Sequence, residues 1–205
     1  MLPYFQKLNV LSDDDYKNLM LDKDEVFQNG KGTITIDTEG NVDRKNYNPG
    51  IAESSDTSKN LILNFTFDIE RFRVAYPDSF IKTIYAIKDS LEENDVKNPM
   101  CASAVMYRNN VTTIWHKHGI FPGVKASNFW VVIYYMHPNW DPAFGGQLSV
   151  GYVREENLGL YDCLSNSFVA HTGIYGHGVD HLKLGYEGHR DILLTHWITE
   201  LPKQL

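Results

Sequence analysis

Residues Phe129–Val153 read "FWVVIYYMHPNWDPAFGGQLSVGYV". A run rich in β-branched and aromatic residues fills 129–137, and a shorter run of the same kind ends the stretch at 145–153. Between them stand prolines, an asparagine and a glycine pair, which interrupt regular structure. Short apolar runs bounded by such residues are typical of buried strands joined by loops.

Similar runs lie on both sides of this stretch. They occupy residues 102–108, 112–118, 167–173, 177–184 and 190–199. Seven strand-like runs in roughly a hundred residues, separated by Gly, Pro and Asn, favour a β-sandwich or barrel, the class that includes jelly rolls and cupins.

The first hundred residues are expected to contain both strands and helices. We expect a hairpin over 33–42, a polar surface loop over 43–60 and a strand over 61–69. In the segment 79–94, apolar residues recur at helical spacing, at Phe80, Ile84, Ile87 and Leu91. This stripe predicts a helix that packs against the core rather than a cofactor site.

Composition narrows the classes of function. The chain of 205 residues has a net charge of −7, which argues against a nucleic-acid partner. No apolar run approaches the roughly 20 residues that span a bilayer, so we expect no membrane partner. Cys101 and Cys163 are too few for a disulfide framework, and the N-terminus does not read as a secretory signal. A cytoplasmic location is therefore expected.

One strand-like run ends in "TIWHKHG", residues 113–119. On a strand, His116 and His118 would point to the same face, about 7 Å apart, where both could bind one metal ion. His177 begins another strand-like run, 177 − 116 = 61 residues later. A pair on one strand with a distant third ligand is how a jelly roll builds a facial metal site. The alternative is that these are ordinary polar histidines at strand ends.

Further elements keep an ordered spacing around these histidines. Tyr107 precedes His116 by nine residues, and "IYYMHPNWDPAFGGQL" (133–148), "HGV" (177–179) and "HRDILLTHW" (189–197) follow. Over about residues 100–200 the sequence resembles the iron(II)/2-oxoglutarate-dependent dioxygenases, and among them the prolyl 4-hydroxylase-like branch. The resemblance implies a mainly β fold, a double-stranded β-helix (jelly roll, cupin-like) with N-terminal supporting α-helices. It also implies a single oxygenase domain over 1–205, with 1–99 packing on a core formed by 100–200.

The resemblance also implies roles for individual residues. His116 and His177 would bind Fe(II), and Arg190 would bind the distal carboxylate of the co-substrate 2-oxoglutarate. Tyr135 would hydrogen-bond the same carboxylate, and Tyr107 would lie near the cofactor. With dioxygen as the oxidant, the expected reaction is hydroxylation of a C–H bond in a peptidyl or free amino acid of prolyl type.

The sequence departs from the family at the position of the acidic ligand, which is His118 here. Either His118 completes a three-histidine site, or it turns away and leaves two ligands. Related halogenases have a small residue at this position, so the bulky His118 argues against halogenation.

The spacing around Arg190 departs as well. Arg190 follows His177 by 190 − 177 = 13 residues and precedes Trp197 by seven, each more than usual. An inserted loop at 184–188 would absorb the first difference and a β-bulge the second. Lys183 or His189 could bind the carboxylate in place of Arg190.

Two other functions stay open. A cupin-like three-histidine dioxygenase would not use 2-oxoglutarate, and a non-catalytic jelly-roll binding module would have a decayed metal site. The remaining histidines are interpreted as polar strand residues, except for one expected in a turn: His171, His181, His189 and His196, and His137 in the turn. The sequence does not indicate an oligomeric state.

Overall fold

The computed structural model describes residues 3–29, 32–36, 42–45, 58–63, 68–108, 115–118, 123–153, 156–180 and 189–201. The helices are α1 (Asp13–Asn29) and α2 (Asp78–Glu92), with short 3-10 turns η1 (Ile69–Val74), η2 (Ala126–Asn128) and η3 (Pro142–Phe144). The strands are β1 (Tyr4–Leu8), β2 (Gly32–Ile36), β3 (Val42–Lys45), β4 (Ser58–Leu63), β5 (Asn98–Arg108), β6 (Phe129–Tyr135), β7 (Leu148–Gly151), β8 (Asn157–Tyr161), β9 (Ser167–Thr172), β10 (Gly176–Val179) and β11 (His189–Ile198).

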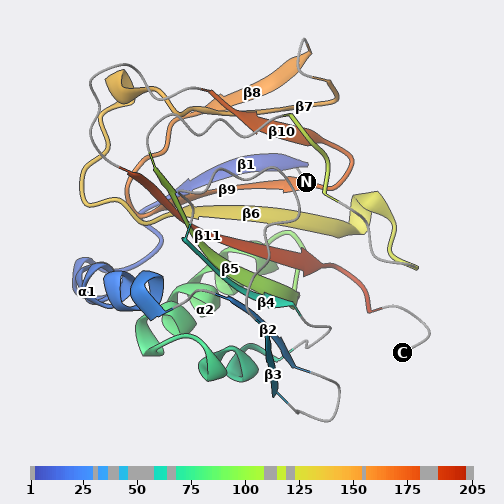
Figure 1. Cartoon of the computed structure of the whole chain (residues 1–205). Helices are drawn as coiled ribbons and strands as arrows, with labels where there is room; N and C mark the ends of the chain where they lie inside the picture. Colours follow the sequence, from blue (N-terminus) through green and yellow to red (C-terminus); the bar gives the residue numbers. More distant parts are fainter. Residues whose placement is uncertain are drawn as a thin grey trace.

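Two sheets face each other, with the helices on the outer face of the larger one (Figure 1). The large sheet has eight strands in the order β1-β9-β6-β11-β5-β4-β2-β3, and the small sheet has the order β10-β7-β8. The pairings are antiparallel except for β2 with β4. This arrangement confirms the predicted fold, a double-stranded β-helix with N-terminal supporting helices.

Strand β6 shows why its sequence is apolar throughout. Trp130, Val132 and Tyr134 face the helices and belong to one buried core cluster. The alternate residues Val131 and Ile133 belong to a second cluster that lies between the two sheets. Because successive strand residues point to opposite faces, a strand covered on both sides is apolar at every position.

The helices are anchored to the strands that carry the candidate site. The apolar stripe of α2 is fully buried, which confirms the helix predicted over 79–94. On α1, the buried Lys23 ammonium forms an ion pair with the Asp191 carboxylate at the start of β11. Lys23 also donates to the Met136 carbonyl at 3.2 Å, and the Tyr16 hydroxyl donates to the His137 carbonyl. Helix α1 therefore fixes the end of β6 against the start of β11.

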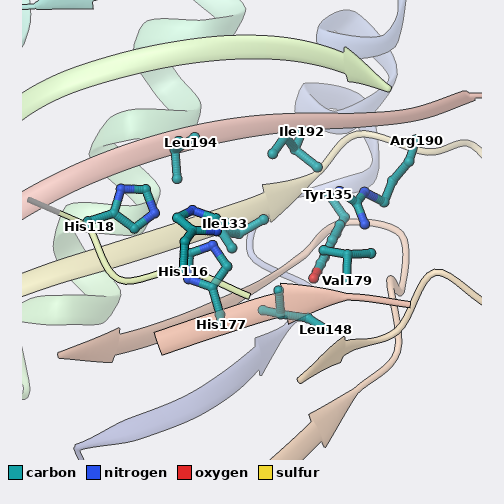
Figure 2. Close-up of a pocket in the computed structure, with 10 residues that line it drawn as sticks. All are labelled: His116, His118, Ile133, Tyr135, Leu148, His177, Val179, Arg190, Ile192 and Leu194. Carbon is teal, nitrogen blue, oxygen red and sulfur yellow. The ribbon is translucent and has the colours of Figure 1, made fainter. Parts of the chain in front are cut away.

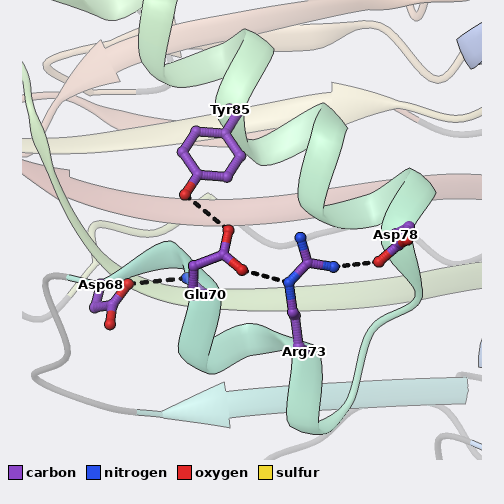
Figure 3. A network of polar contacts seen from close by, with 5 residues as sticks. All are labelled: Asp68, Glu70, Arg73, Asp78 and Tyr85. Carbon is purple, nitrogen blue, oxygen red and sulfur yellow. Dashed lines mark hydrogen bonds and ion pairs between the residues drawn. The ribbon is translucent and has the colours of Figure 1, made fainter.

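A polar network fixes the corner between η1 and α2 (Figure 3). The Glu70 carboxylate accepts hydrogen bonds from the Tyr85 hydroxyl, at 2.8 Å, and from the Arg73 guanidinium. Arg73 also pairs with Asp78 in the first turn of α2, and the Asp68 side chain caps η1. These charges are largely exposed, and solvent screens such pairs, so the network positions the corner more than it stabilises the fold.

The sequence-based predictions failed at sheet edges. Residues 43–45 of strand β3 and residues 58–60 of β4 lie in the span 43–60 that was predicted to be a surface loop. Strand β8 was not predicted at all. Both β3 and β8 are edge strands, paired on one side, and an edge strand does not require an alternating apolar pattern in its sequence. The predicted hairpin over 33–42 is confirmed by the pairing of β2 with β3, although its turn lies outside the described residues.

The described part of the chain contains no helix with the length and apolarity needed to cross a bilayer.

Candidate metal centre and adjoining pocket

His116 and His177 lie directly opposite each other. The His116 amide donates to the His177 carbonyl at 3.0 Å, and the His177 amide donates to the His116 carbonyl at 2.9 Å. This single bridge joins residue 116 to β10, and it holds the two ring centroids 4.5 Å apart. The backbone of the small sheet therefore brings together two histidines that are distant in the sequence.

His118 turns toward this pair rather than away from it. Its ring centroid lies 5.0 Å from that of His116 and 5.0 Å from that of His177. One ring nitrogen from each of the three lies within 4.8 Å of the others. Two nitrogens bound to one ion at about 2.1 Å can be at most about 4.2 Å apart, so small ring movements would suffice. The donor set fits a divalent metal ion.

His171 holds the outer nitrogen of His177. His177 Nδ1 lies 2.9 Å from His171 Nε2, and His171 Nδ1 lies 3.0 Å from the Thr172 carbonyl oxygen. Burial lowers the pKa of His171 to about 4 and that of His177 well below its ordinary value. Both imidazoles are therefore neutral at neutral pH, which is the form that binds metals.

His196 makes the matching contact to His118. Its Nε2 lies 3.0 Å from His118 Nδ1, and its Nδ1 contacts the Cys101 thiol. The ring stacks on Phe129, with centroids 5.3 Å apart and an interplanar angle of 16°. His171 and His196 are polar strand residues, as predicted, and each also hydrogen-bonds one histidine of the candidate centre, a contact that the sequence did not indicate.

The alternation of side chains along β11 could have indicated that His196 lies near the candidate site. It follows Arg190 by 196 − 190 = 6 residues on the same strand, so the two point to the same face. The intervening Ile192 and Leu194 line the same pocket as Arg190. No comparable signal marks His171, whose contact depends on how β9 and β10 approach each other.

A pocket extends from the three histidines (Figure 2), with about 350 Å³ of space when the open solvent at its mouth is included. Arg190 and Tyr135 lie toward its other end. The walls between them are aliphatic, formed by Ile133, Leu148, Val179, Ile192 and Leu194. The pocket therefore has a metal-binding end, an apolar middle and a cationic end.

Arg190 is buried at the cationic end, where Nη1 approaches the Gly146 carbonyl at 3.5 Å. Gly145 and Gly146 both have positive φ, 79° and 70°, in the turn after η3, which explains the glycine pair. The Cys163 thiol donates to the same Gly146 carbonyl at 2.8 Å. Burial raises the pKa of Cys163 to about 11 and that of Tyr135 well above its ordinary value. With both neighbours neutral, this end of the pocket suits an anion.

The remaining candidate site residues, Tyr107 near the cofactor and Lys183 or His189 as alternatives to Arg190, are placed less fully. Tyr107 lies opposite Arg190 in the pairing of β5 with β11, and its side chain lies outside the described part of the structure. His189 begins β11, likewise without a described side chain, while Lys183 and the segment 184–188 fall outside the described residues. The bulge predicted between Arg190 and Trp197 is wrong for this strand: the register with β5 shifts between His196 and Trp197, but the extra residue, Met100, belongs to β5, and β11 stays in register with β6.

No family model and no curated protein matches the sequence. Solved structures match at low identity but over almost the whole chain. A prolyl-4-hydroxylase from Pseudomonas putida is 15% identical, with a TM-score of 0.57, over 96% of this chain and 91% of its own. A prolyl hydroxylase from Trichoplax adhaerens, in complex with a hypoxia inducible factor peptide fragment, is 13% identical, with a TM-score of 0.64, over 96% and 84%.

A third structure is a non-heme α-ketoglutarate-dependent carbocyclase from nogalamycin biosynthesis. It is 11% identical, with a TM-score of 0.64, over 96% of this chain and 79% of its own. The chain therefore has the double-stranded β-helix fold of the iron(II)- and 2-oxoglutarate-dependent oxygenases that it resembles.

Proposed function

We propose that residues 1–205 form a single oxygenase domain, an iron(II)- and 2-oxoglutarate-dependent dioxygenase that binds its metal through His116, His118 and His177. The observation that carries the proposal is one pocket with three imidazoles at one end and a buried guanidinium at the other. The fold supports it, because the solved structures with this fold include several enzymes of that class.

The chemistry of 2-oxoglutarate matches the two ends of the pocket. Its keto acid end is a chelating group for a metal ion, and its far end is a carboxylate. Arg190 offers a planar fork of N–H donors that suits bidentate carboxylate binding, and the neutral Tyr135 hydroxyl can donate beside it. The aliphatic walls fit the methylene groups between the two carboxylates.

The metal end also fits iron(II). Three neutral imidazoles are good ligands for this ion, and they leave its other positions for co-substrate and dioxygen. This set is one charge unit more positive than the two-histidine, one-carboxylate set, and the dianionic co-substrate would offset that charge. When bound, iron(II) would activate dioxygen, the oxidant, with 2-oxoglutarate supplying two of the four electrons and the C–H substrate the other two, while the apolar walls limit the access of water.

The substrate remains a proposal of its own. A peptidyl or free amino acid of prolyl type is supported by the neighbour solved with a peptide. One structural neighbour is a carbocyclase, so proteins with this fold also catalyse reactions other than hydroxylation. An intracellular location is part of the proposal, since neither Cys101 nor Cys163 takes part in a disulfide bond.

Co-substrate binding to the iron-loaded protein without oxygen tests the proposal. Arg190→Ala removes the buried partner of the distal carboxylate, a change that costs about 2–5 kcal/mol at a buried charge pair, or roughly 30-fold to several thousand-fold in the Kd of 2-oxoglutarate. Iron affinity should change little. Arg73→Ala, at an exposed arginine away from the pocket, is the matched control. Equal losses of iron and 2-oxoglutarate binding in Arg190→Ala would count against the role of Arg190.

A three-histidine dioxygenase that does not use 2-oxoglutarate is the second candidate. The observation that favours it is the approach of His118 to the other two histidines, because that donor set matches such enzymes. It predicts dioxygen consumption without 2-oxoglutarate and no effect of Arg190→Ala. A binding module with a decayed site is less consistent with the geometry, since three converging donors serve no purpose there.

A further inference from the structure

Two histidines outside the proposed ligand set stand in one row across the large sheet. Cys101 on β5 pairs with His196 on β11, His196 pairs with Val131 on β6, and Val131 pairs with His171 on β9. Adjacent strands are about 4.8 Å apart, so His196 and His171 stand roughly 10 Å apart, one on each side of Val131. His171 therefore contacts His177, and His196 contacts a different histidine of the candidate metal centre, His118.

The direction of the hydrogen bonds at His171 follows from the chemistry. The Thr172 carbonyl can only accept, so His171 Nδ1 carries the proton and donates to it. In the neutral ring, His171 Nε2 is then an acceptor, and His177 Nδ1 must donate to it. His177 is thereby left with a lone pair on Nε2, the nitrogen that can bind a metal.

The row of hydrogen bonds from Cys101 through His196 to His118 has two possible directions, because a thiol can both donate and accept. If Cys101 donates, His196 Nε2–H donates to His118 Nδ1, and the proton of His118 sits on Nε2, where it blocks a metal. If His196 donates to Cys101 instead, it accepts from His118 Nδ1–H, and His118 Nε2 is open. Each ring carries one proton in both arrangements, so they interconvert without net proton uptake.

We propose that His171 and His196 are positioning residues that set the tautomer of the two ligands beside them, a proposal that rests on the proposed metal site. His171 holds His177 permanently in the metal-binding tautomer. His196, seated between Cys101 and Phe129, gives His118 two tautomers, of which the metal selects one. A carboxylate at position 118 would need no such partner, whereas an imidazole that binds through Nε2 does.

Nitrogen-15 NMR of the histidine rings tests the tautomers directly, with and without zinc as a diamagnetic probe. His171 and His177 should carry Nδ1–H in both states. His118 and His196 should show both tautomers without metal and only Nδ1–H with zinc. A proton on Nε2 of His177 in the metal-free protein would overturn the fixed half of the proposal. Unchanged tautomers at His118 and His196 on zinc binding would overturn the other half.

Cobalt affinity, measured by chelator competition, supplies the second readout. Loss of such an outer partner typically weakens metal binding about 10- to 100-fold, and we expect this for His171→Leu and His196→Leu. His196→Gln should restore most of the affinity, because its amide oxygen can accept from His118 Nδ1–H. Thr195→Val is the matched control. Thr195 is buried on the same strand, and its hydroxyl accepts a hydrogen bond from the Trp197 indole N–H rather than contacting a histidine.

Thr195→Val should lower thermal stability and leave cobalt affinity within about twofold of wild type. Wild-type affinity in His196→Leu, or an equal loss in Thr195→Val, would refute the positioning role. Cobalt binding needs neither 2-oxoglutarate nor dioxygen, so the proposed reaction can fail while the positioning role stands. If the wild type binds no metal, both the reaction and the selection of the His118 tautomer fall, and the His171–His177 tautomers are still tested.

Discussion

Replacing His118 with alanine should weaken metal binding more than any change at the outer histidines. The structure brings three donor nitrogens within 4.8 Å of one another, and the variant leaves two. Structural zinc sites with four ligands contribute about 10–16 kcal/mol, or roughly 2.5–4 kcal/mol for each ligand. At about 1.4 kcal/mol per tenfold change, losing one ligand corresponds to a loss of roughly 60- to 700-fold in affinity.

The size of this loss separates a ligand from a bystander. His196→Leu removes only the partner of His118 and should cost about 10- to 100-fold, so the order of the two variants is itself predicted. His118→Asp should retain iron binding within about tenfold of wild type, because an anionic ligand replaces a neutral one. The assay is anaerobic competition for iron(II) with a calibrated chelator.

A control must show that losing any buried histidine does not produce the same effect. His137 is buried but does not belong to the three-histidine cluster, so His137→Gln should leave iron affinity close to that of wild type. Wild-type iron affinity in His118→Ala would refute the three-histidine centre and leave His116 and His177 as the protein ligands.

Three other outcomes are expected. Lys23→Met leaves Asp191 buried without its ion-pair partner and should cost about 3–5 kcal/mol of folding free energy. In a calorimetric scan this loss should lower Tm by roughly 6–20 °C. The control variant Lys82→Met, at the exposed pair with Asp15, should shift Tm by no more than a few degrees. Because burial raises the folded-state pKa of Cys163 from 9.0 to about 11, its contribution to stability is present below pH 9 and is lost as the pH rises toward 11, by roughly 2–3 kcal/mol in total. Denaturant titrations of Cys163→Ala should therefore show a flatter decline over that range than wild type, and parallel declines would contradict this. Gly146→Ala should lose about 1–2 kcal/mol of stability in the same titration, because an L-residue is strained at a φ of 70°, and no change would mean that the turn can adopt another conformation.

The parts of the fold that could be predicted from sequence are those where burial imposes a pattern. Strand β6 and the stripe of α2 are buried, so their apolar spacing reports their geometry directly. Strands β3 and β8 lie at sheet edges, where pairing on one side tolerates polar residues; β8 was not predicted, and of β3 only its first residue was, as the end of the predicted hairpin.

At the candidate site, strand spacing singled out His116 and His177, and the family resemblance singled out Arg190; the structure brings all three to one pocket. The sequence left the direction of the His118 ring open, because two residues beyond a single bridge the chain is no longer held in a strand. The contacts of His171 and His196 depend on the register of β9, β6 and β11, and register is a property of strand pairing that one sequence does not specify.

The central claim is that one pocket binds iron(II) and 2-oxoglutarate together, and an absorption spectrum of the anaerobic protein tests it most directly. Wild-type protein loaded with iron(II) should develop a metal-to-ligand charge-transfer band when 2-oxoglutarate is added, because the keto acid chelates the metal. Arg190→Ala should require much more 2-oxoglutarate to reach the same band. A wild-type protein that binds one equivalent of iron but shows no band at saturating 2-oxoglutarate would contradict the claim.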